Sequence, residues 1–195
     1  MLERTSAIAA GLARGGRMPH GEAGCRLGEV RDWTLLQVAG FPGSFAAVEA
    51  TVAAACGGSA PAKVGDTAQS GDILLMRTGP EQLWLVGPGE VLAQETALRK
   101  GLDPTVGPLT PLSHSRSWMF IEGPRARDVL AKGIAIDLSA DRFPVDACAL
   151  TGLDHTPILL HRSAADRYEL WAMRSFALTV WDWLTDAALE FGYEV

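Results

Sequence analysis

The segment Ser113-His114-Ser115-Arg116 is the part of the chain whose residue types come closest to a reactive centre. A serine beside a histidine could supply a nucleophile and its base. Adjacent residues on an extended segment point to opposite faces, however, so Ser113 and His114 would not hold each other in hydrogen-bonding geometry. No Gly-x-Ser-x-Gly motif surrounds them. We therefore assign no catalytic residue and predict a structural role at the junction between two halves of the chain.

Histidines and cysteines are too scattered to predict a metal centre. His155 and His161 are six residues apart, with no third ligand near them in the sequence. None of Cys25, Cys56 and Cys148 forms a Cys-x-x-Cys pair. The glycine-rich patterns of dinucleotide-binding sites and of P-loops are also absent. We therefore expect this chain to bind neither a metal nor a cofactor.

Composition limits the class of protein. Of the 195 residues, 48% are apolar and 21% are charged, which is typical of a folded globular protein. A formal net charge of −6 argues against a broad nucleic-acid surface. No run of about eighteen apolar residues occurs, so we expect no membrane span. The odd number of cysteines fits a reducing compartment, and we expect a cytoplasmic protein.

Ordered elements are expected to follow the same order twice. In the first half, hydrophobic periodicity and turn residues predict strand, helix, strand, strand and helix at 33–39, 45–56, 72–78, 83–87 and 90–100. In the second half, the same order is predicted at 117–122, 124–132, 157–162, 167–173 and 175–191. These elements must position any site that the chain carries.

A sequence echo supports a duplication. Residues 73–78 match residues 158–163 at an offset of 85, and Gly40 matches Gly123 at an offset of 83. A chance likeness between two apolar strands is the alternative. We predict an α+β fold with two pseudo-symmetric β-α-β-β-α halves. The expected boundaries are an irregular arm over 1–31, a first half over 32–108 and a second half over 109–195.

Two regions are candidates for contact with a partner protein. The arm leans basic and includes Arg14 and Arg17; a solvated tail is the alternative. We expect deletion of residues 1–31 to weaken assembly without unfolding the core. The last predicted helix is apolar around more than half of its circumference. We predict burial for Leu178 and Leu189 and partner contact for Trp183, since tryptophan is enriched in binding hot spots.

A set of short motifs runs through the second half of the chain: 112–116, 123–133, 137–138, 143–144, 147–149, 174–176, 181–184 and 190–192. Together these motifs resemble the gamma subunit of heterotetrameric sarcosine oxidase. The first half is similar more loosely, mainly over residues 83–88. A more distant similarity, a Ser-His pair entering a strand and then a glycine and a helix, is to the folate-binding fold of the aminomethyltransferases. That similarity implies the duplicated α+β architecture predicted above.

The resemblance implies a non-catalytic structural subunit of a four-chain flavoenzyme that oxidises sarcosine to glycine. Hydrogen peroxide is released, with formaldehyde or, when tetrahydrofolate is present, methylenetetrahydrofolate. The alpha, beta and delta subunits are the implied partners, and FAD, FMN, NAD and tetrahydrofolate are expected on them, with zinc on the small fourth chain. One alternative is a free-standing folate-binding protein of one-carbon transfer, in which Asp146 or Asp154 faces the pterin. The other is a regulatory domain with an unrelated partner.

Overall fold

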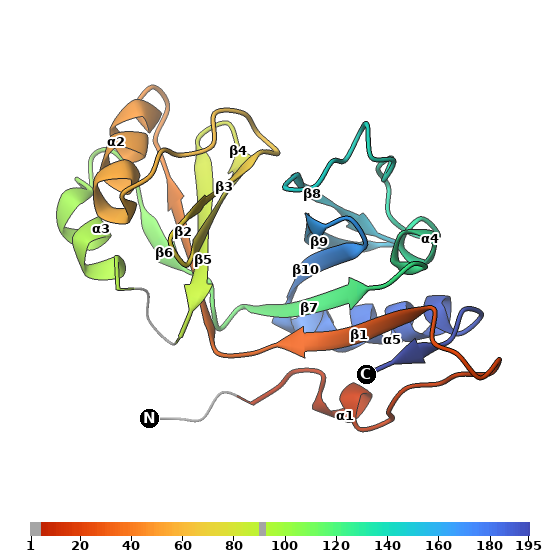
Figure 1. The fold of residues 1–195 in the computed structure, drawn as a ribbon. Helices are drawn as coiled ribbons and strands as arrows, with labels where there is room; N and C mark the ends of the chain where they lie inside the picture. Colours follow the sequence, from red (N-terminus) through yellow and green to blue (C-terminus); the bar gives the residue numbers. More distant parts are fainter. Residues whose placement is uncertain (1–4, 90–92) are drawn as a thin grey trace. The chain divides into compact units, whose positions relative to one another are not determined.

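The chain divides into two compact units that do not coincide with the predicted halves. A computed structural model describes residues 5–89 and 93–195 (Figure 1). One unit comprises residues 32–114, and we call it the central unit because it is central in the sequence. The other comprises residues 1–31 and 115–195, and we call it the terminal unit. The structure thus differs from the predicted boundary at 108/109 and joins the predicted arm to the second half.

The central unit is a five-stranded antiparallel sheet with two helices. Its elements are β2 (Trp33–Ala39), α2 (Phe45–Cys56), β3 (Thr67–Ser70), β4 (Ile73–Gly79), β5 (Gln82–Pro88), α3 (Glu95–Gly101) and β6 (Leu109–Pro111). The strand order is β3-β4-β5-β2-β6. β6 falls beyond the predicted boundary at 108, but it pairs with β2 and so belongs to this unit. The predicted start of the second helix, Glu90, lies outside the described residues.

The terminal unit is a six-stranded sheet with α5 along one face (Figure 1). Its elements are α1 (Ala9–Leu12), β1 (Cys25–Val30), β7 (Arg116–Glu122), α4 (Ala126–Leu130), β8 (Cys148–Leu153), β9 (Thr156–Ala164), β10 (Arg167–Met173), η1 (Arg174–Phe176), α5 (Ala177–Ala188) and β11 (Tyr193–Glu194). The strand order is β11-β1-β7-β10-β9-β8, and only the β1–β11 pair is parallel. No helix in the described part of either unit is long and apolar enough to cross a membrane.

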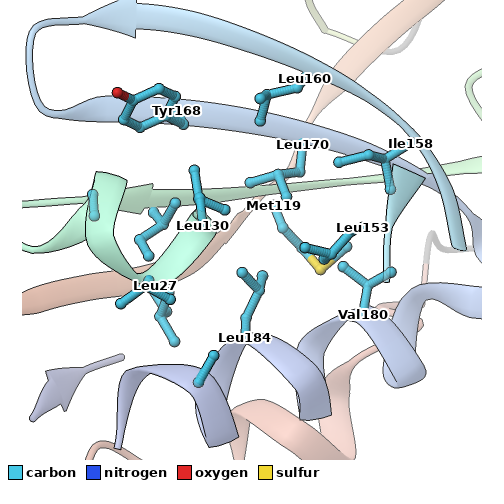
Figure 2. Close-up of a cluster of buried hydrophobic side chains, with 14 of the residues drawn as sticks. Leu27, Met119, Leu130, Leu153, Ile158, Leu160, Tyr168, Leu170, Val180 and Leu184 are labelled. Carbon is cyan, nitrogen blue, oxygen red and sulfur yellow. The ribbon is translucent and has the colours of Figure 1, made fainter. Parts of the chain in front are cut away.

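The core of the terminal unit lies between its sheet and the helices α4 and α5 (Figure 2). Met119 of β7 and Leu170 of β10 point from the sheet toward Leu184 of α5, and all three are buried. The alternation of apolar side chains along each strand explains this arrangement, because every second residue of a strand faces the same side. The mixed α+β architecture predicted from the sequence is confirmed.

Strand order and register show the duplication directly. The run β3-β4-β5-β2 in the central unit has the same connectivity as β8-β9-β10-β7 in the terminal unit. Leu75 faces Leu85 across the first hairpin, and Leu160 faces Leu170 across the second. Leu160 lies 85 residues after Leu75, and Leu170 lies 85 residues after Leu85, which is the offset found in the sequence. The repeat is therefore structural and not a chance likeness of two apolar strands.

An arginine with a mostly buried side chain occupies the same place in each unit. Arg77 in β4 donates to the carbonyl three residues later at 2.6 Å and to Pro61 O at 3.2 Å. Arg162 in β9 donates to the carbonyl three residues later at 2.7 Å and to Phe143 O at 2.9 Å. Each guanidinium therefore ties the hairpin turn to the segment that enters the preceding strand. Its fixed fork of donors suits it to hold two carbonyls at once.

Residues 5–31 are not an irregular arm in the structure. β1 lies inside the sheet, paired with β7 on one side and β11 on the other. Ile8, Cys25 and Leu27 are buried in the core of the terminal unit. Glycines conceal this strand in the sequence, because a Cβ at Gly28 would lie 2.4 Å from the ring of Phe120. A position that admits only glycine cannot contribute to the alternating apolar pattern by which a strand is recognised.

Candidate partner-binding surface

Ser113 has a structural role within the central unit. Its hydroxyl oxygen accepts a hydrogen bond from the Leu35 N–H at 2.9 Å and lies 3.4 Å from the Leu35 carbonyl, to which it donates. The side chain is buried, whereas His114 is exposed. Ser113 thus fastens the end of this unit to β2, directly before the division at 114/115. A hydroxyl bonded to the backbone on both sides is not available as a nucleophile for a neighbouring base.

The two candidate pterin-facing carboxylates lie at opposite ends of β9. Asp154 lies in the exposed turn between β8 and β9 with a positive φ of 51°, and the Nε2 atom of His155 is 3.6 Å from its carboxylate. Asp146 lies near the other end, where its N–H donates to the carbonyl of Arg162. Among the residues that the structure describes, no three His, Cys, Asp or Glu side chains gather in a way that could hold a metal ion.

The structure brings Arg14 and Arg17 to one place, beside α5. The helix α1 packs directly on α5, because a Cβ at Gly11 would lie 2.2 Å from the Trp181 ring. The chain then continues to Arg17, whose N–H and C=O bond with the backbone of Tyr193 in β11 at 2.8 and 2.7 Å. Both arginines are thereby placed by ordered backbone, and neither lies on a free tail.

A surface hollow of about 210 Å³ separates these arginines from the acidic side of α5. Its charged lining comprises Arg14, Arg17, Asp182 and Asp186. Arg14 Nη1 lies 2.7 Å from Asp182 Oδ1, so this pair is internally satisfied. Among the described residues, no hydrogen bond or ion pair reaches the side chain of Arg17 or of Asp186. The hollow therefore offers one cation and one anion to a partner.

Leu189 lines the hollow and Leu178 lies on the same side of α5, in contrast to the prediction that both are buried. Leu178 and Leu189 are each 37% exposed. Together with Asp182 they occupy helical positions i, i+4 and i+11, which form one stripe on the side of α5 opposite its buried residues. The prediction of burial was wrong because the core of the terminal unit needs only the stripe that includes Val180 and Leu184. An exposed apolar stripe beside charged groups is a common composition for a protein–protein contact.

Trp183 lies on a different side of α5 from the hollow. It is partly buried and packs against the core of the terminal unit. A Cβ at Gly133 would lie 2.3 Å from its ring, so the indole covers the end of the α4 segment. Trp183 thus has a packing role within its own unit, and partner contact by its exposed part stays a prediction.

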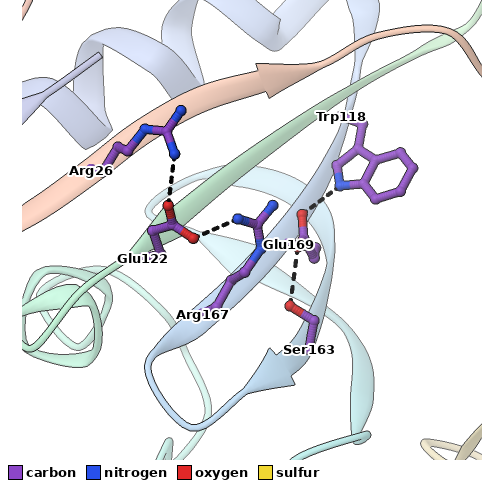
Figure 3. Close-up of polar contacts among 6 residues, drawn as sticks. All are labelled: Arg26, Trp118, Glu122, Ser163, Arg167 and Glu169. Carbon is purple, nitrogen blue, oxygen red and sulfur yellow. Dashed lines mark hydrogen bonds and ion pairs between the residues drawn. The ribbon is translucent and has the colours of Figure 1, made fainter.

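A polar network that sequence reasoning missed lies on the sheet face opposite α5 (Figure 3). Glu122 in β7 binds two arginines: its Oε1 is 3.1 Å from Arg26 Nη1, and its Oε2 is 2.5 Å from Arg167 Nη1. Both guanidinium groups also lie over the ring of Phe120, at 5.5 and 4.2 Å from its centre. The network links three neighbouring strands, β1, β7 and β10.

Glu169 continues the network toward β9. Its carboxylate accepts hydrogen bonds from Arg167 Nε at 2.6 Å, from Trp118 Nε1 at 2.6 Å and from Ser163 Oγ at 3.0 Å (Figure 3). The side chain is buried, so these three donors replace the water that a charged group would otherwise need. One sequence signal was available: Arg167 and Glu169 are two apart in a strand, so they share a face.

The opposite charges in this network determine the protonation states of its members. Burial acts to raise the pKa of Glu122, but its hydrogen bonds and charge interactions with Arg167 and Arg26 outweigh burial and lower the pKa. For Arg167, burial acts to lower the pKa, but its hydrogen bonds and charge interactions with Glu169 and Glu122 outweigh burial and raise the pKa. A carboxylate held ionised in this way is a poor proton donor near neutral pH. The arrangement supports strand positioning rather than acid–base chemistry.

His161 is a buried titratable group outside this network. It lies in β9 with its ring centre 6.4 Å from that of Trp171. Among the described residues, neither ring nitrogen has a hydrogen-bond partner. Burial lowers the pKa of His161, against smaller opposing effects of Glu169 and Asp146. The imidazole is therefore held in its neutral form.

A protein-family model matches most of this chain. The model of the family described as "Sarcosine oxidase, gamma subunit family" matches residues 42–190. The chain is 36% identical over 178 residues to the sarcosine oxidase subunit gamma of Corynebacterium sp. (strain U-96), covering 88% of this chain and 82% of that protein. It is 32% identical over 167 residues to the subunit gamma of Arthrobacter sp., covering 85% and 80%.

Solved structures show the same relationship. A chain of the heterotetrameric sarcosine oxidase from Corynebacterium sp. U-96, in complex with pyrrole 2-carboxylate, superposes with a TM-score of 0.84 and 31% identity over 96% of both chains. The glycine cleavage system aminomethyltransferase T from Bartonella henselae superposes with a TM-score of 0.65 and 19% identity over 85% of this chain and 46% of that one. The second likeness concerns the fold alone.

Proposed function

The chain belongs to the sarcosine oxidase gamma subunit family, and on that premise we propose that it is the non-catalytic structural subunit of a heterotetrameric sarcosine oxidase. The observation that carries this proposal is the match to a chain of the Corynebacterium oxidase over 96% of both chains. The functional groups described above point the same way. Ser113 is bonded to the backbone and Glu122 to two arginines, so both serve to hold the fold.

The partners in this proposal are the alpha, beta and delta subunits of the oxidase, acting in the cytoplasm. FAD, FMN, NAD and tetrahydrofolate would be bound by those partners, and the assembled enzyme would oxidise the N-methyl group of sarcosine. This chain would contribute surfaces that hold the assembly together. Obligate interfaces are large and mostly apolar, so more than one surface of the chain would be covered.

We place one partner contact at the hollow beside α5. Arg17 and Asp186 offer unpaired charges, Leu189 offers apolar area within the hollow, and Leu178 extends it along the same side of α5. A partner segment with an acidic and a basic residue flanking an apolar one would match this lining. Arg14 belongs to the same surface through its pair with Asp182. Trp183 is a separate proposed contact on the α4 side of the helix.

The test is co-expression of the alpha, beta and delta chains with and without this chain. The proposal predicts that omission prevents recovery of a stable complex in size-exclusion chromatography, and that sarcosine-dependent hydrogen peroxide production falls with it. If the three other chains assembled and turned over equally well alone, the structural role would be wrong.

The folate-binding alternative has its own test with the isolated chain. Calorimetric titration with tetrahydrofolate should give no saturable heat if the chain is a structural subunit. Saturable binding with one molecule per chain, lost in Asp154→Asn or Asp146→Asn, would instead support a free-standing folate protein.

A further inference from the structure

Three of the four sheet edges among the described residues are protected against pairing with another chain. β3 has four residues, β6 has three and ends in Pro111, and β11 has two. The outer side of β11 is also covered, because Arg17 bridges to Tyr193. Short strands, prolines and covering segments are the usual means by which proteins keep an edge strand from pairing.

The fourth edge, β8, lacks these protections over part of its length. It has six residues, Cys148–Leu153, with no charged side chain and no proline (Figure 1). It pairs with β9 from end to end without a bulge. Its last part is covered on the outer side, where the Ala135 N–H donates to Gly152 O.

The backbone of Leu150 points outward from this edge. In an antiparallel ladder the N–H and C=O of one residue point to the same side, and successive residues alternate. The carbonyl of Ala147 accepts from Arg162 N–H, toward β9, whereas that of Gly152 accepts from the outer side. Leu150 has the parity of Gly152, so both its backbone groups face outward. Among the described residues, none bonds with either group.

The side chain of Leu150 adds an apolar contact to these free backbone groups. It is 55% exposed, although it lies beside Leu159, which is buried. Addition of a strand to an open edge draws its affinity from backbone hydrogen bonds and its specificity from such alternate side chains. The edge therefore has the three components that strand addition needs: a donor, an acceptor and an apolar side chain.

Charge at the two ends of β8 indicates what kind of strand could bind. Asp146 precedes the strand and Asp154 follows it. Two copies of this chain paired antiparallel about Leu150 would place Asp154 of each opposite Asp146 of the other, which like-charge repulsion disfavours. A segment with an apolar centre and basic flanks would instead be attracted at both ends.

We propose that β8 is a docking edge on which an extended segment of another oxidase subunit, apolar in the centre and basic at its flanks, adds as a further strand of the sheet. This inference rests on the proposed function, because it needs the assembled enzyme. It assigns a contact distinct from the hollow beside α5.

Hydrogen exchange of the purified complex tests the docking edge. In the isolated chain the Leu150 amide should exchange quickly, while those of Ala149 and Thr151, which face β9, exchange slowly. In the complex we expect the Leu150 amide to slow at least about tenfold. An unchanged rate in a recovered complex overturns the docking edge alone, and failure to recover any complex overturns the proposed function as well. Slow exchange of the Leu150 amide already in the isolated chain would indicate that a second copy of the chain covers the edge, and it would also overturn the docking-edge proposal.

Substitutions at Leu150 supply an independent readout. Leu150→Pro removes the outward N–H and the leucine side chain without removing a hydrogen bond to β9, and Leu150→Asp places a carboxylate at the edge. Each should reduce the fraction of chain recovered in the complex about tenfold. Val64→Asp is the matched control, since Val64 is 54% exposed in the central unit, and it should assemble like the wild type. Normal assembly of both Leu150 variants would contradict the proposal, and circular dichroism of Leu150→Asp checks that the fold is kept.

Discussion

Beside its four repeated strands the central unit has one short extra strand, β6, whereas the terminal unit adds β1 and β11 and has a longer final helix, α5, than its counterpart α3. The repeated parts agree closely, down to the arginines Arg77 and Arg162. The added segments provide Arg14, Arg17 and Tyr193 of the hollow beside α5, and Arg26 of the polar network. The comparison teaches that the repeat supplies the fold, and that the features suited to partners lie in the terminal unit, which has the larger additions.

Residues at equivalent positions of the two repeats also differ between the units. The network residues Arg167 and Glu169 correspond, at the offset of 85, to Gln82 and Trp84 in the central unit. There the Trp84 indole donates to Gln37 at 3.0 Å, a neutral contact in place of ion pairs. The ionic network is therefore a property of the terminal unit and not of the duplicated plan.

Removal of residues 1–31 should have the largest effect, and it distinguishes an arm from a core segment. The truncation removes β1 from inside the sheet together with Ile8 and Leu27 of the core. We expect a loss of more than about 5 kcal/mol, comparable with the whole stability of a domain. Circular dichroism and limited proteolysis should show an unfolded terminal unit. This replaces the expectation that the truncation weakens assembly alone, and a truncated chain with native spectra would restore that expectation.

Substitution of the equivalent arginines Arg77 and Arg162 tests whether this arginine stabilises both units equally. Arg77→Met and Arg162→Met each leave two carbonyls without their donor. Each should lower the free energy of unfolding by about 2–4 kcal/mol, measured by urea denaturation. Lysine at either position keeps the charge but lacks the fork, so it should restore only part of the loss. An effect confined to one unit would show that only one arginine holds its hairpin.

Gly11→Ala tests the contact between α1 and α5. The new Cβ would lie 2.2 Å from the buried Trp181 ring, so α1 must shift. We expect a loss of about 1–3 kcal/mol in thermal or urea unfolding. Gly79→Ala in the central unit is the matched control, because its Cβ would meet only Gln82 at 3.4 Å, and its effect should stay within about 0.5 kcal/mol. Equal effects of the two substitutions would contradict the packing described for α1.

His161→Met copies the residue of the central unit, Met76, into the terminal unit. Burial lowers the pKa of His161 in the folded chain, so the unfolded chain binds the proton more strongly. The protonation of His161 therefore lowers the free energy of unfolding at pH values below the unfolded pKa of about 6.5, and this effect disappears at higher pH. The variant should be more stable by about 1 kcal/mol at neutral pH, since two unpartnered nitrogens are removed, and by more at pH 5. Unfolding curves that shift equally at pH 5 and pH 8 would contradict burial of a neutral imidazole.

Arg14→Gln should have the smallest effect on stability. The Arg14–Asp182 pair is exposed, so its loss should cost less than about 1 kcal/mol. Any larger consequence should appear in assembly, together with that of Arg17→Gln. Arg31→Gln, outside the hollow, is the control in a pull-down of the co-expressed chains. If all three variants assembled equally, the hollow would not be a partner contact.

Sequence reasoning succeeded where side chains alternate clearly. Residues 33–39 were predicted as a strand and form β2, and the helix predicted at 175–191 appears as η1 followed by α5. The predicted order of elements omitted β1, β3, β6, β8 and β11. β3 is polar and four residues long, and β11 has two residues, so neither can show a period. Their positions depend on pairing with strands distant in the sequence.

The candidate surface was harder to predict than the fold. Arg14 and Arg17 were selected from the basic composition of their segment, but the contact of Gly11 with Trp181 and the bridge between Arg17 and Tyr193 bring them beside α5. Leu178 and Leu189 could have been placed by counting which stripe the core needs. The free edge of β8 depends on what lies beside the strand, and no local sequence pattern reports that.

Purification of the tagged chain from its native host tests the central claim most directly. The visible spectrum and the masses of the co-purifying chains should be recorded after gentle isolation. As a structural subunit of a sarcosine oxidase, the chain should elute with larger partner chains and with flavin absorbance. A colourless chain that elutes alone would contradict the account and favour a free-standing folate-binding or regulatory protein.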